Sequence, residues 1–178
     1  MMSESPEQER LFFALWPDAH QQQAWAQAAK EWLPPSTGRL VAAENLHLTL
    51  LFAGEVTLGQ RQCLEQMADA ICGDSFVLHF DRSGYWRRPQ VVWWGCSQTP
   101  AALLELAQSL QAGAKECGIA VDECPYAAHL TLARKVRRPP LPITPPMAEW
   151  RVDRFVLVRS QLSPKGSVYE PLRSWTLA

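Results

Sequence analysis

The alternation of apolar and polar residues along the chain predicts many short strands. The aromatic-rich run LFFALW at 11–16 is stopped by Pro17 and is typical of a buried strand. LHLTLLF at 46–52 alternates, as a strand with one face in a core does. The other expected strands are 75–86, 90–97, 127–134, 150–162 and 167–177.

Three segments of helical periodicity separate these strands. The expected helices run from Asp18 to Pro34, from Thr57 to Gly73 and from Thr99 to Gly118. Thr57 and Gln60 match a capping box at the start of the second helix. The prolines of 137–146 favour a semi-rigid surface loop. This mixture of elements predicts an α+β fold.

Two parts of the chain repeat the same order of elements. A strand, a helix and an HLTL strand follow one another in 11–52 and again in 91–133. The step from Leu11 to His47 is 36 residues and the step from Val91 to His129 is 38. We therefore expect one domain over 1–178, with an internal duplication and two similar lobes that each carry one HLTL strand.

Composition narrows the class of protein. The formal net charge of −1 argues against a surface that binds nucleic acid over its whole extent, but it allows a local basic site. Five cysteines without a C-x-x-C spacing predict reduced thiols and no disulfide framework. The N-terminus is polar and no run is long enough to cross a bilayer, so we expect a soluble cytoplasmic protein.

The two HLTL strands carry the candidate chemistry. Because side chains alternate along a strand, the leucines share one face while His47 and Thr49 share the other, and His129 and Thr131 do the same. If an approximate two-fold brings these faces together, a cleft holds two imidazoles and two hydroxyls. A neutral imidazole can accept a proton and an imidazolium can donate one, which suits in-line displacement at phosphorus.

Other interpretations of these histidines remain open. Both tetrads could be plain core strands of a structural repeat. Two histidines could also hold zinc, but a catalytic zinc needs a third protein ligand, and no H-x-x-H or paired Cys/His spacing is present. We expect His20 to be solvated and His79 to be an ordinary strand histidine. Trp93 and Trp94 should face opposite ways, so at most one of them reaches the cleft.

Several stretches together resemble the 2H phosphoesterase family, in its bacterial RNA 2′,3′-cyclic phosphodiesterase branch, formerly called 2′-5′ RNA ligase. The stretches are RLFFALWP at 10–17, HLTLLFAGEV at 47–56, HLTLAR at 129–134 and FVLVRSQLSPKGSVYEPLRSWTL at 155–177. The resemblance implies two pseudo-symmetric lobes, each an antiparallel sheet with helices on its outer face, around a central cleft. It also implies hydrolysis of a terminal 2′,3′-cyclic phosphate to a 2′-phosphate without a cofactor or metal, and possible 2′-5′ ligation.

The resemblance also assigns roles to individual residues. His47 resembles the proton donor and His129 the proton acceptor, while Thr49 and Thr131 resemble the hydroxyls that contact phosphate. Arg134 would be an anion contact, although it lies one residue off the His129 alternation and reaches the cleft only if the strand bends or ends there.

RNA ends or nucleotides with a cyclic phosphate are the expected substrates, without a membrane or an obligate protein partner. The basic run Arg134, Lys135, Arg137 and Arg138 could contact RNA or simply be a solvated loop. A non-catalytic protein that binds RNA ends in the same cleft remains the alternative function.

Overall fold

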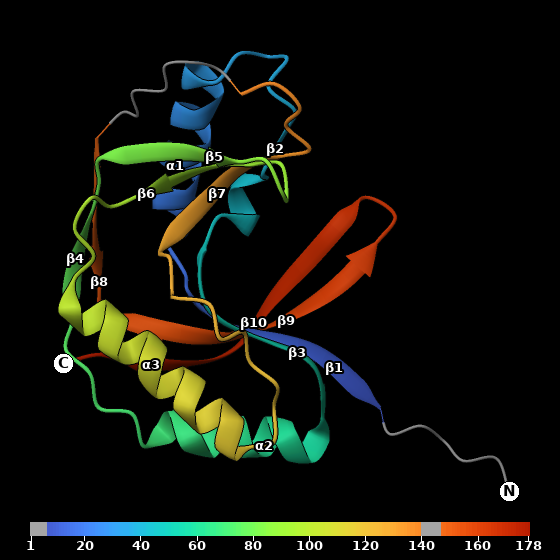
Figure 1. The fold of residues 1–178 in the computed structure, drawn as a ribbon, viewed down its shortest axis with the longest axis vertical. Helices are drawn as coiled ribbons and strands as arrows, with labels where there is room; N and C mark the ends of the chain where they lie inside the picture. Colours follow the sequence, from blue (N-terminus) through green and yellow to red (C-terminus); the bar gives the residue numbers. More distant parts are fainter. Residues whose placement is uncertain (1–6, 140–146) are drawn as a thin grey trace, which may run out of the picture.

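The computed structural model describes residues 7–139 and 147–178 (Figure 1). The described elements, in chain order, are β1 (Gln8–Leu15), α1 (Ala19–Trp32), β2 (Arg39–Leu40), the 3₁₀ helix η1 (Ala43–Asn45), β3 (Leu48–Thr57), α2 (Leu58–Asp69), β4 (Phe76–Phe80), β5 (Arg82–Trp86), β6 (Val91–Gly95), α3 (Ala101–Glu116), β7 (His129–Arg134), β8 (Ala148–Val152), β9 (Arg154–Ser163) and β10 (Gly166–Thr176). The α+β class is confirmed.

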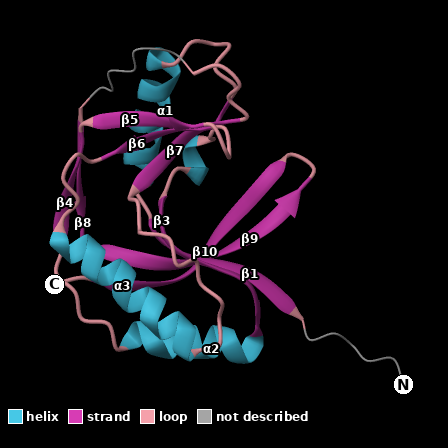
Figure 2. Cartoon of the chain, in the orientation of Figure 1, coloured by secondary structure: helices cyan, strands magenta, loops and turns pink. Residues whose placement is uncertain are grey.

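One long antiparallel sheet organises the molecule. Its strands run in the order β10-β9-β1-β3-β7-β6-β5, and β2 adds to β7. The two halves of this sheet, β10-β9-β1-β3 and β7-β6-β5, meet where β3 pairs with β7, at Leu48 and Leu130. Figure 2 shows the two halves diverging from this junction. The junction is therefore where the two HLTL strands lie side by side.

The helices α1 and α3 each connect two strands of one half of the sheet but pack against the other half. α1 connects β1 and β3, yet its Trp32 packs on Trp94 of β6, and its Trp25 packs on Phe80 and Trp150 of the separate β4-β8 sheet. α3 connects β6 and β7, yet it lies against α2 below β3 (Figure 1). The helices thus interlock the two halves, and a largely common apolar core lies between them.

Most local predictions are confirmed by the structure. Thr57 and Gln60 form the expected capping box, with Gln60 N donating to Thr57 Oγ1 at 3.2 Å and Thr57 N donating to Gln60 Oε1 at 3.0 Å. The apolar stripe of α3, Leu103, Leu106, Leu110 and Ala114, is buried. α2 ends at Asp69, four residues before the glycine that was expected to end it.

Two expected strands, 75–86 and 150–162, are each interrupted at an aspartate. Asp81 separates β4 from β5, and Asp153 separates β8 from β9. On one side of each break the strand belongs to a separate two-stranded sheet, β4-β8, and on the other side it enters the long sheet. The Asp81 carboxylate accepts a hydrogen bond from Ser97 N at 2.7 Å, which anchors this turn.

The prediction that all cysteines are reduced is wrong for one pair. Cys63 in α2 and Cys117, just after α3, form a disulfide with a Cα–Cα distance of 5.7 Å. Cys72, Cys96 and Cys124 are free. The partners are 54 residues apart in sequence, so the local spacing of cysteines carries no sign of the pair, whereas the packing of α2 on α3 brings them together.

Two predictions fall partly or wholly on residues outside the described ranges. Of the expected loop 137–146, only residues 137–139 are described, and residues 1–6 of the polar N-terminus are not. Among the helices of the described ranges, none has the length and apolar character needed to span a bilayer.

Candidate active site at the junction of the two motif strands

The HLTL strands present their histidines and threonines from one face of the long sheet. Leu48 and Leu130 are paired across the junction and both are fully buried, so their neighbours point to the opposite face. Because β3 and β7 are antiparallel, His47 lies toward Thr131 and Thr49 lies toward His129. The two motifs are therefore adjacent at the junction between the two halves of the sheet.

A β-bulge in β7 brings Arg134 to the same face as His129 and Thr131. Val92 and Trp93 of β6 pair with Ala133 and Thr131, so Leu132 is an extra residue in β7. Leu132 and Ala133 are consequently both buried, and the alternation continues with Arg134 exposed. Bulges often re-aim a side chain beside an active site. The sequence predicted that Arg134 could reach the cleft only if its strand bends or ends there, and the bulge at Leu132 supplies this bend.

β3 contains the matching bulge. Phe13 and Ala14 of β1 pair with Leu51 and Thr49, which leaves Leu50 as the extra residue. The residue five positions after His47 is then Phe52, whose exposed fraction is 49%. Arg10 lies over its ring at 5.0 Å from the centroid. Equivalent positions in the two motif strands therefore hold a cation in β7 and an aromatic ring in β3.

Both ring nitrogens of His47 have hydrogen-bond partners. Its Nδ1 lies 2.7 Å from the carbonyl oxygen of Asn45, and because a carbonyl can only accept, Nδ1 carries a proton. In the neutral ring Nε2 is then the acceptor, and Thr49 Oγ1, at 3.1 Å, can donate to it. The ring stacks on Trp16 with centroids 5.2 Å apart and meets the edge of Tyr169 at 5.2 Å.

This enclosure changes the proton affinity of His47. Burial lowers its pKa to about 4, although the Asn45 carbonyl acts in the opposite direction. The positive charges of Arg134 and of protonated His129 contribute to this lowering of the pKa, after burial. In the ligand-free protein the His47 ring is therefore neutral at pH 7, with Nε2 ready to take a proton.

His129 has the same anchor but a more open setting. Its Nδ1 lies 2.8 Å from the carbonyl oxygen of Ala127, again two residues earlier in the chain. The ring meets Trp86 in an edge-to-face contact at 4.5 Å between centroids. Burial, and to a lesser extent Arg134, lowers the pKa of His129, while the Ala127 carbonyl raises it. Each motif thus leaves one ring nitrogen, Nε2, for proton transfer.

Cavities open on both sides of this pair of strands. One of about 510 Å³ is lined by His47, Thr131 and Arg134, and one of about 330 Å³ by His47, Thr49 and Arg134. A third, of about 750 Å³, is lined by Thr49 and His129. All five predicted site residues therefore border cavities at the junction.

The other histidines and tryptophans considered in the sequence analysis lie away from the junction or pack against other side chains. His20 is exposed, and His79 is an exposed strand histidine 3.5 Å from Glu149. Trp94 is fully buried, whereas Trp93 packs on Trp86 with centroids 5.2 Å apart. No group of three or more His, Cys, Asp or Glu side chains that could hold a metal occurs within the described part of the chain.

Sequence reasoning missed the aromatic side chains that enclose the histidines. Trp16 follows the first strand, Tyr169 lies on β10 and Trp86 ends β5, so they come from segments far apart in the chain. Only strand pairing brings them to the motifs. Tyr169 lies between the exposed residues Val168 and Glu170, but alternation alone does not say what a side chain faces.

Comparisons with known proteins identify the family of the chain. The signature of the 2′-5′ RNA ligase superfamily matches residues 16–163. A protein of Escherichia coli (strain K12) named RNA 2′,3′-cyclic phosphodiesterase is 36% identical over 173 residues, which cover 96% of this chain and 98% of that one. A Thermus thermophilus protein of the same name is 32% identical, covering 94% of this chain and 90% of that one.

A solved structure confirms the fold class. The crystal structure of E. coli LigT complexed with 3′-AMP superposes with a TM-score of 0.88 and 35% sequence identity, covering 96% of this chain and 99% of that one. The resemblance noted from the motifs is thereby confirmed over nearly the whole length. The chain belongs to the 2′-5′ RNA ligase superfamily.

Proposed function

We propose that the protein is an RNA 2′,3′-cyclic phosphodiesterase that needs no metal and converts a terminal 2′,3′-cyclic phosphate into a 2′-phosphate. The names of its relatives support this substrate. The observation that carries the proposal is the junction itself: two H-x-T strands lie side by side, and each histidine has Nδ1 anchored on a carbonyl and Nε2 left for chemistry.

In the proposed reaction His129 Nε2 takes a proton from water as the water oxygen bonds to phosphorus. The bond from phosphorus to the ribose 3′-oxygen breaks, and His47 Nε2 gives that oxygen a proton. The net change is the addition of one water molecule, and the phosphate stays on the 2′-oxygen. Each positioned proton transfer contributes typically about 10²–10⁴-fold.

The hydroxyls of Thr49 and Thr131 and the guanidinium of Arg134 are proposed to bind the non-bridging phosphate oxygens. Charge on these oxygens must be neutralised in the displacement, and donors already in place stabilise it without reorganisation. Arg134 has a second effect, because its charge lowers the pKa of both histidines. Bound phosphate opposes that charge, so substrate binding favours protonation of His47, which is neutral in the free protein.

The donor and acceptor roles can be separated with a substrate whose 3′-oxygen is replaced by sulfur. A thiolate leaves without being protonated, so it needs no proton donor. The proposal predicts that this substrate restores turnover to His47→Ala and leaves His129→Ala inactive. Rescue of His129→Ala alone would reverse the two roles.

Turnover of a nucleoside 2′,3′-cyclic phosphate in excess EDTA tests the function as a whole. The proposal predicts undiminished turnover, a 2′-phosphate by end-group analysis and a bell-shaped pH profile. A zinc enzyme would lose activity in EDTA, and a non-catalytic protein that binds RNA ends would give no product.

Three further points extend this proposal. We propose that residues 11–52 and 91–133 are an internal duplication within one domain, supported by the equivalent bulges and the equivalent carbonyl anchors. The same site would join RNA ends through a 2′-5′ linkage when a 5′-hydroxyl takes the place of water. We place this activity in the cytoplasm, on RNA ends produced there.

A further inference from the structure

The 510 Å³ cavity beside His47 concentrates positive charge that the proposed reaction does not use. Its wall includes Arg39, Lys135 and Lys165 in addition to Arg134, and Glu44 supplies the one carboxylate among the described residues that line it. Within 7–139 and 147–178, none of these four cations forms an ion pair, whereas Arg61, Arg154, Arg159 and Arg173 all do. We call the part of the cavity formed by Arg39, Lys135 and Lys165 the basic pocket.

Three separate segments build the basic pocket. Arg39 begins β2, Lys135 follows β7, and Lys165 lies in the turn between β9 and β10. Gly38 lets β2 come close to β7, because a Cβ at this position would lie 2.8 Å from the Arg134 carbonyl oxygen. Arg39 and Arg134 are consequently direct neighbours in the sheet.

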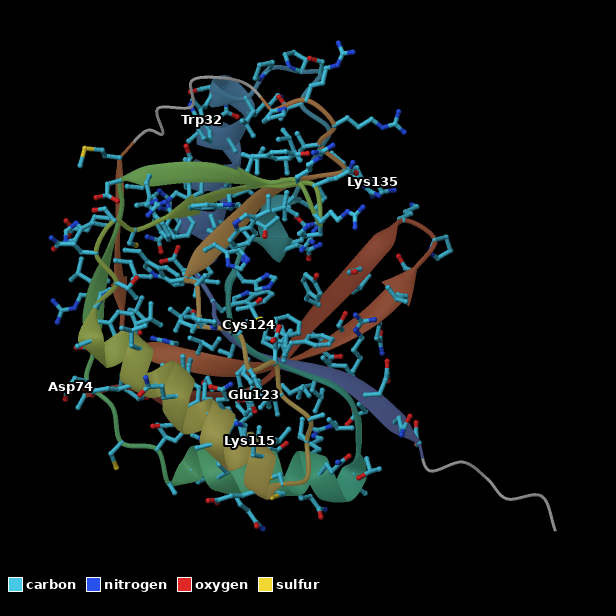
Figure 3. All side chains as sticks on the ribbon, viewed as in Figure 1. Trp32, Asp74, Lys115, Glu123, Cys124 and Lys135 are labelled. Carbon is cyan, nitrogen blue, oxygen red and sulfur yellow. A yellow bond between two sulfur atoms is a disulfide. The ribbon has the colours of Figure 1, made fainter. Side chains whose placement is uncertain are left out.

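Hydrogen bonds tie the β9–β10 hairpin to the other half of the molecule across the pocket. Arg39 Nη2 donates to the Lys165 carbonyl at 2.5 Å, and Asn45 Nδ2 donates to the Ser167 carbonyl at 3.2 Å. Figure 3 shows Lys135 on the side of the molecule toward which this hairpin projects. The side chains of Lys135 and Lys165 are exposed, so they remain available to an anion.

The cavity beside His129 has the opposite character. The described residues that form its wall include the carboxylates of Asp122 and Glu123 but no lysine or arginine. Lys115 pairs with Glu123 at 2.7 Å but does not line the cavity (Figure 3). A polyanion that occupies the junction is therefore attracted toward His47 and repelled on the side of His129.

We propose that the basic pocket binds a second phosphate group of the substrate, the internal phosphodiester on the 5′-oxygen of the terminal nucleoside. This inference rests on the proposed function and deepens it. It makes the preferred substrate an RNA strand, whose next phosphate lies one nucleotide away from the cyclic end. A mononucleoside cyclic phosphate leaves the basic pocket empty.

Kinetics with three substrates tests this inference: adenosine 2′,3′-cyclic phosphate, the same compound with a free 5′-phosphate, and the dinucleotide ApA with a 2′,3′-cyclic phosphate. We expect kcat/KM for ApA to exceed that for the mononucleoside by about tenfold at low salt. Lys165→Gln and Lys135→Asn should each lower the ApA value several-fold, reduce its salt slope by about one, and leave the mononucleoside value unchanged. Lys30→Gln, an exposed lysine of α1, is the matched control.

The compound with a free 5′-phosphate distinguishes the two sources of a second phosphate. A larger gain with the free 5′-phosphate than with ApA would overturn the assignment to an internal linkage. Equal kcat/KM for ApA and the mononucleoside in the unchanged protein would overturn the basic pocket altogether, as would an equal loss in Lys30→Gln.

A binding measurement separates this inference from the proposed function. The dissociation constants of ApA bearing a 2′-phosphate and of 2′-AMP are measured calorimetrically and do not depend on turnover. Tighter binding of the dinucleotide, lost in Lys165→Gln, supports the pocket even if no cyclic phosphate is hydrolysed. Equal binding refutes the pocket even if hydrolysis is fast.

Discussion

The two motif strands share a sequence, a bulge and an anchor, yet they place their histidines in different surroundings. His47 is stacked on Trp16, bounded by Tyr169 and bonded to its own Thr49. Among the described residues, His129 meets one ring, that of Trp86, and it lies on the cavity side that carries acids. The duplicated strand therefore supplies equivalent groups, and the surrounding segments make those groups inequivalent.

The consequence is chemical as well as geometric. A symmetric pair of imidazoles would have the same proton affinity, whereas acid–base catalysis needs one donor and one acceptor. The pKa values of both rings are lowered by burial, and that of His47 falls to about 4. The cation at Arg134 has no counterpart in β3, where Phe52 occupies the equivalent position. Four experiments test whether the two histidines differ in this way.

Removal of either imidazole should have the largest effect. His47→Ala and His129→Ala are each expected to lower kcat by at least about 10³-fold, because each removes one proton transfer. Circular dichroism and the unfolding midpoint check that the fold survives. Full activity in either variant would show that the ring is not part of the chemistry.

Arg134→Gln should have the next largest effect. Loss of a donor aimed at developing negative charge is expected to lower kcat about 10²-fold. The same change removes a positive charge and should raise the pKa of both histidines, which NMR titration measures directly. Arg138→Gln, four residues further along the same basic run, is the control and should change neither quantity.

The lowered pKa of half-buried His47 should make stability depend on pH. Between about pH 6.5 and pH 4 the unfolded chain binds a proton that folded His47 does not, so the free energy of unfolding falls as the pH falls through this range. The loss attributable to His47 is roughly 2–3 kcal/mol. Urea unfolding of His47→Gln should show that much less loss of stability on acidification.

The control for this measurement is His20→Gln, which alters an exposed histidine of α1. It should leave the pH dependence of stability unchanged. An unaltered slope in His47→Gln would mean that the folded ring is protonated as readily as in the unfolded chain.

The smallest effect is expected from the aromatic rings themselves. Trp16→Leu opens one face of His47 to solvent and should raise its pKa toward 6.5, while the pKa of His129 stays the same. Trp86→Leu should do the reverse, raising only the pKa of His129. NMR titration of both variants is the measurement. If either variant shifts both histidines equally, the two environments are not independent.

Local patterns in the sequence predicted the elements and the motif strands. Alternation in HLTL separated the leucines from His47 and Thr49 without any knowledge of the fold, because the period of a strand is two. The capping box at Thr57 and the apolar stripe of α3 were likewise readable, since both depend on residues within a few positions of one another.

Features that depend on strand pairing or on helix packing could not be predicted from local patterns in the sequence. The bulge at Leu132, which brings Arg134 into the site, is set by the register of β7 against β6. The breaks at Asp81 and Asp153 reflect a change of sheet, and the disulfide joins cysteines from two packed helices. None of these has a local signal.

The order of residues along the chain was enough to establish which chemical groups this protein could use: two imidazoles and two hydroxyls on the polar face of strands whose leucines had to be buried. The differences between these groups arise from the folded arrangement, because the neighbours of each ring come from segments far apart in the chain. The rings on either side of His47, the cations of the basic pocket and the acids near His129 meet only through long-range packing. Proton affinity and the local field depend on those neighbours, and alternation along a strand carries no information about them.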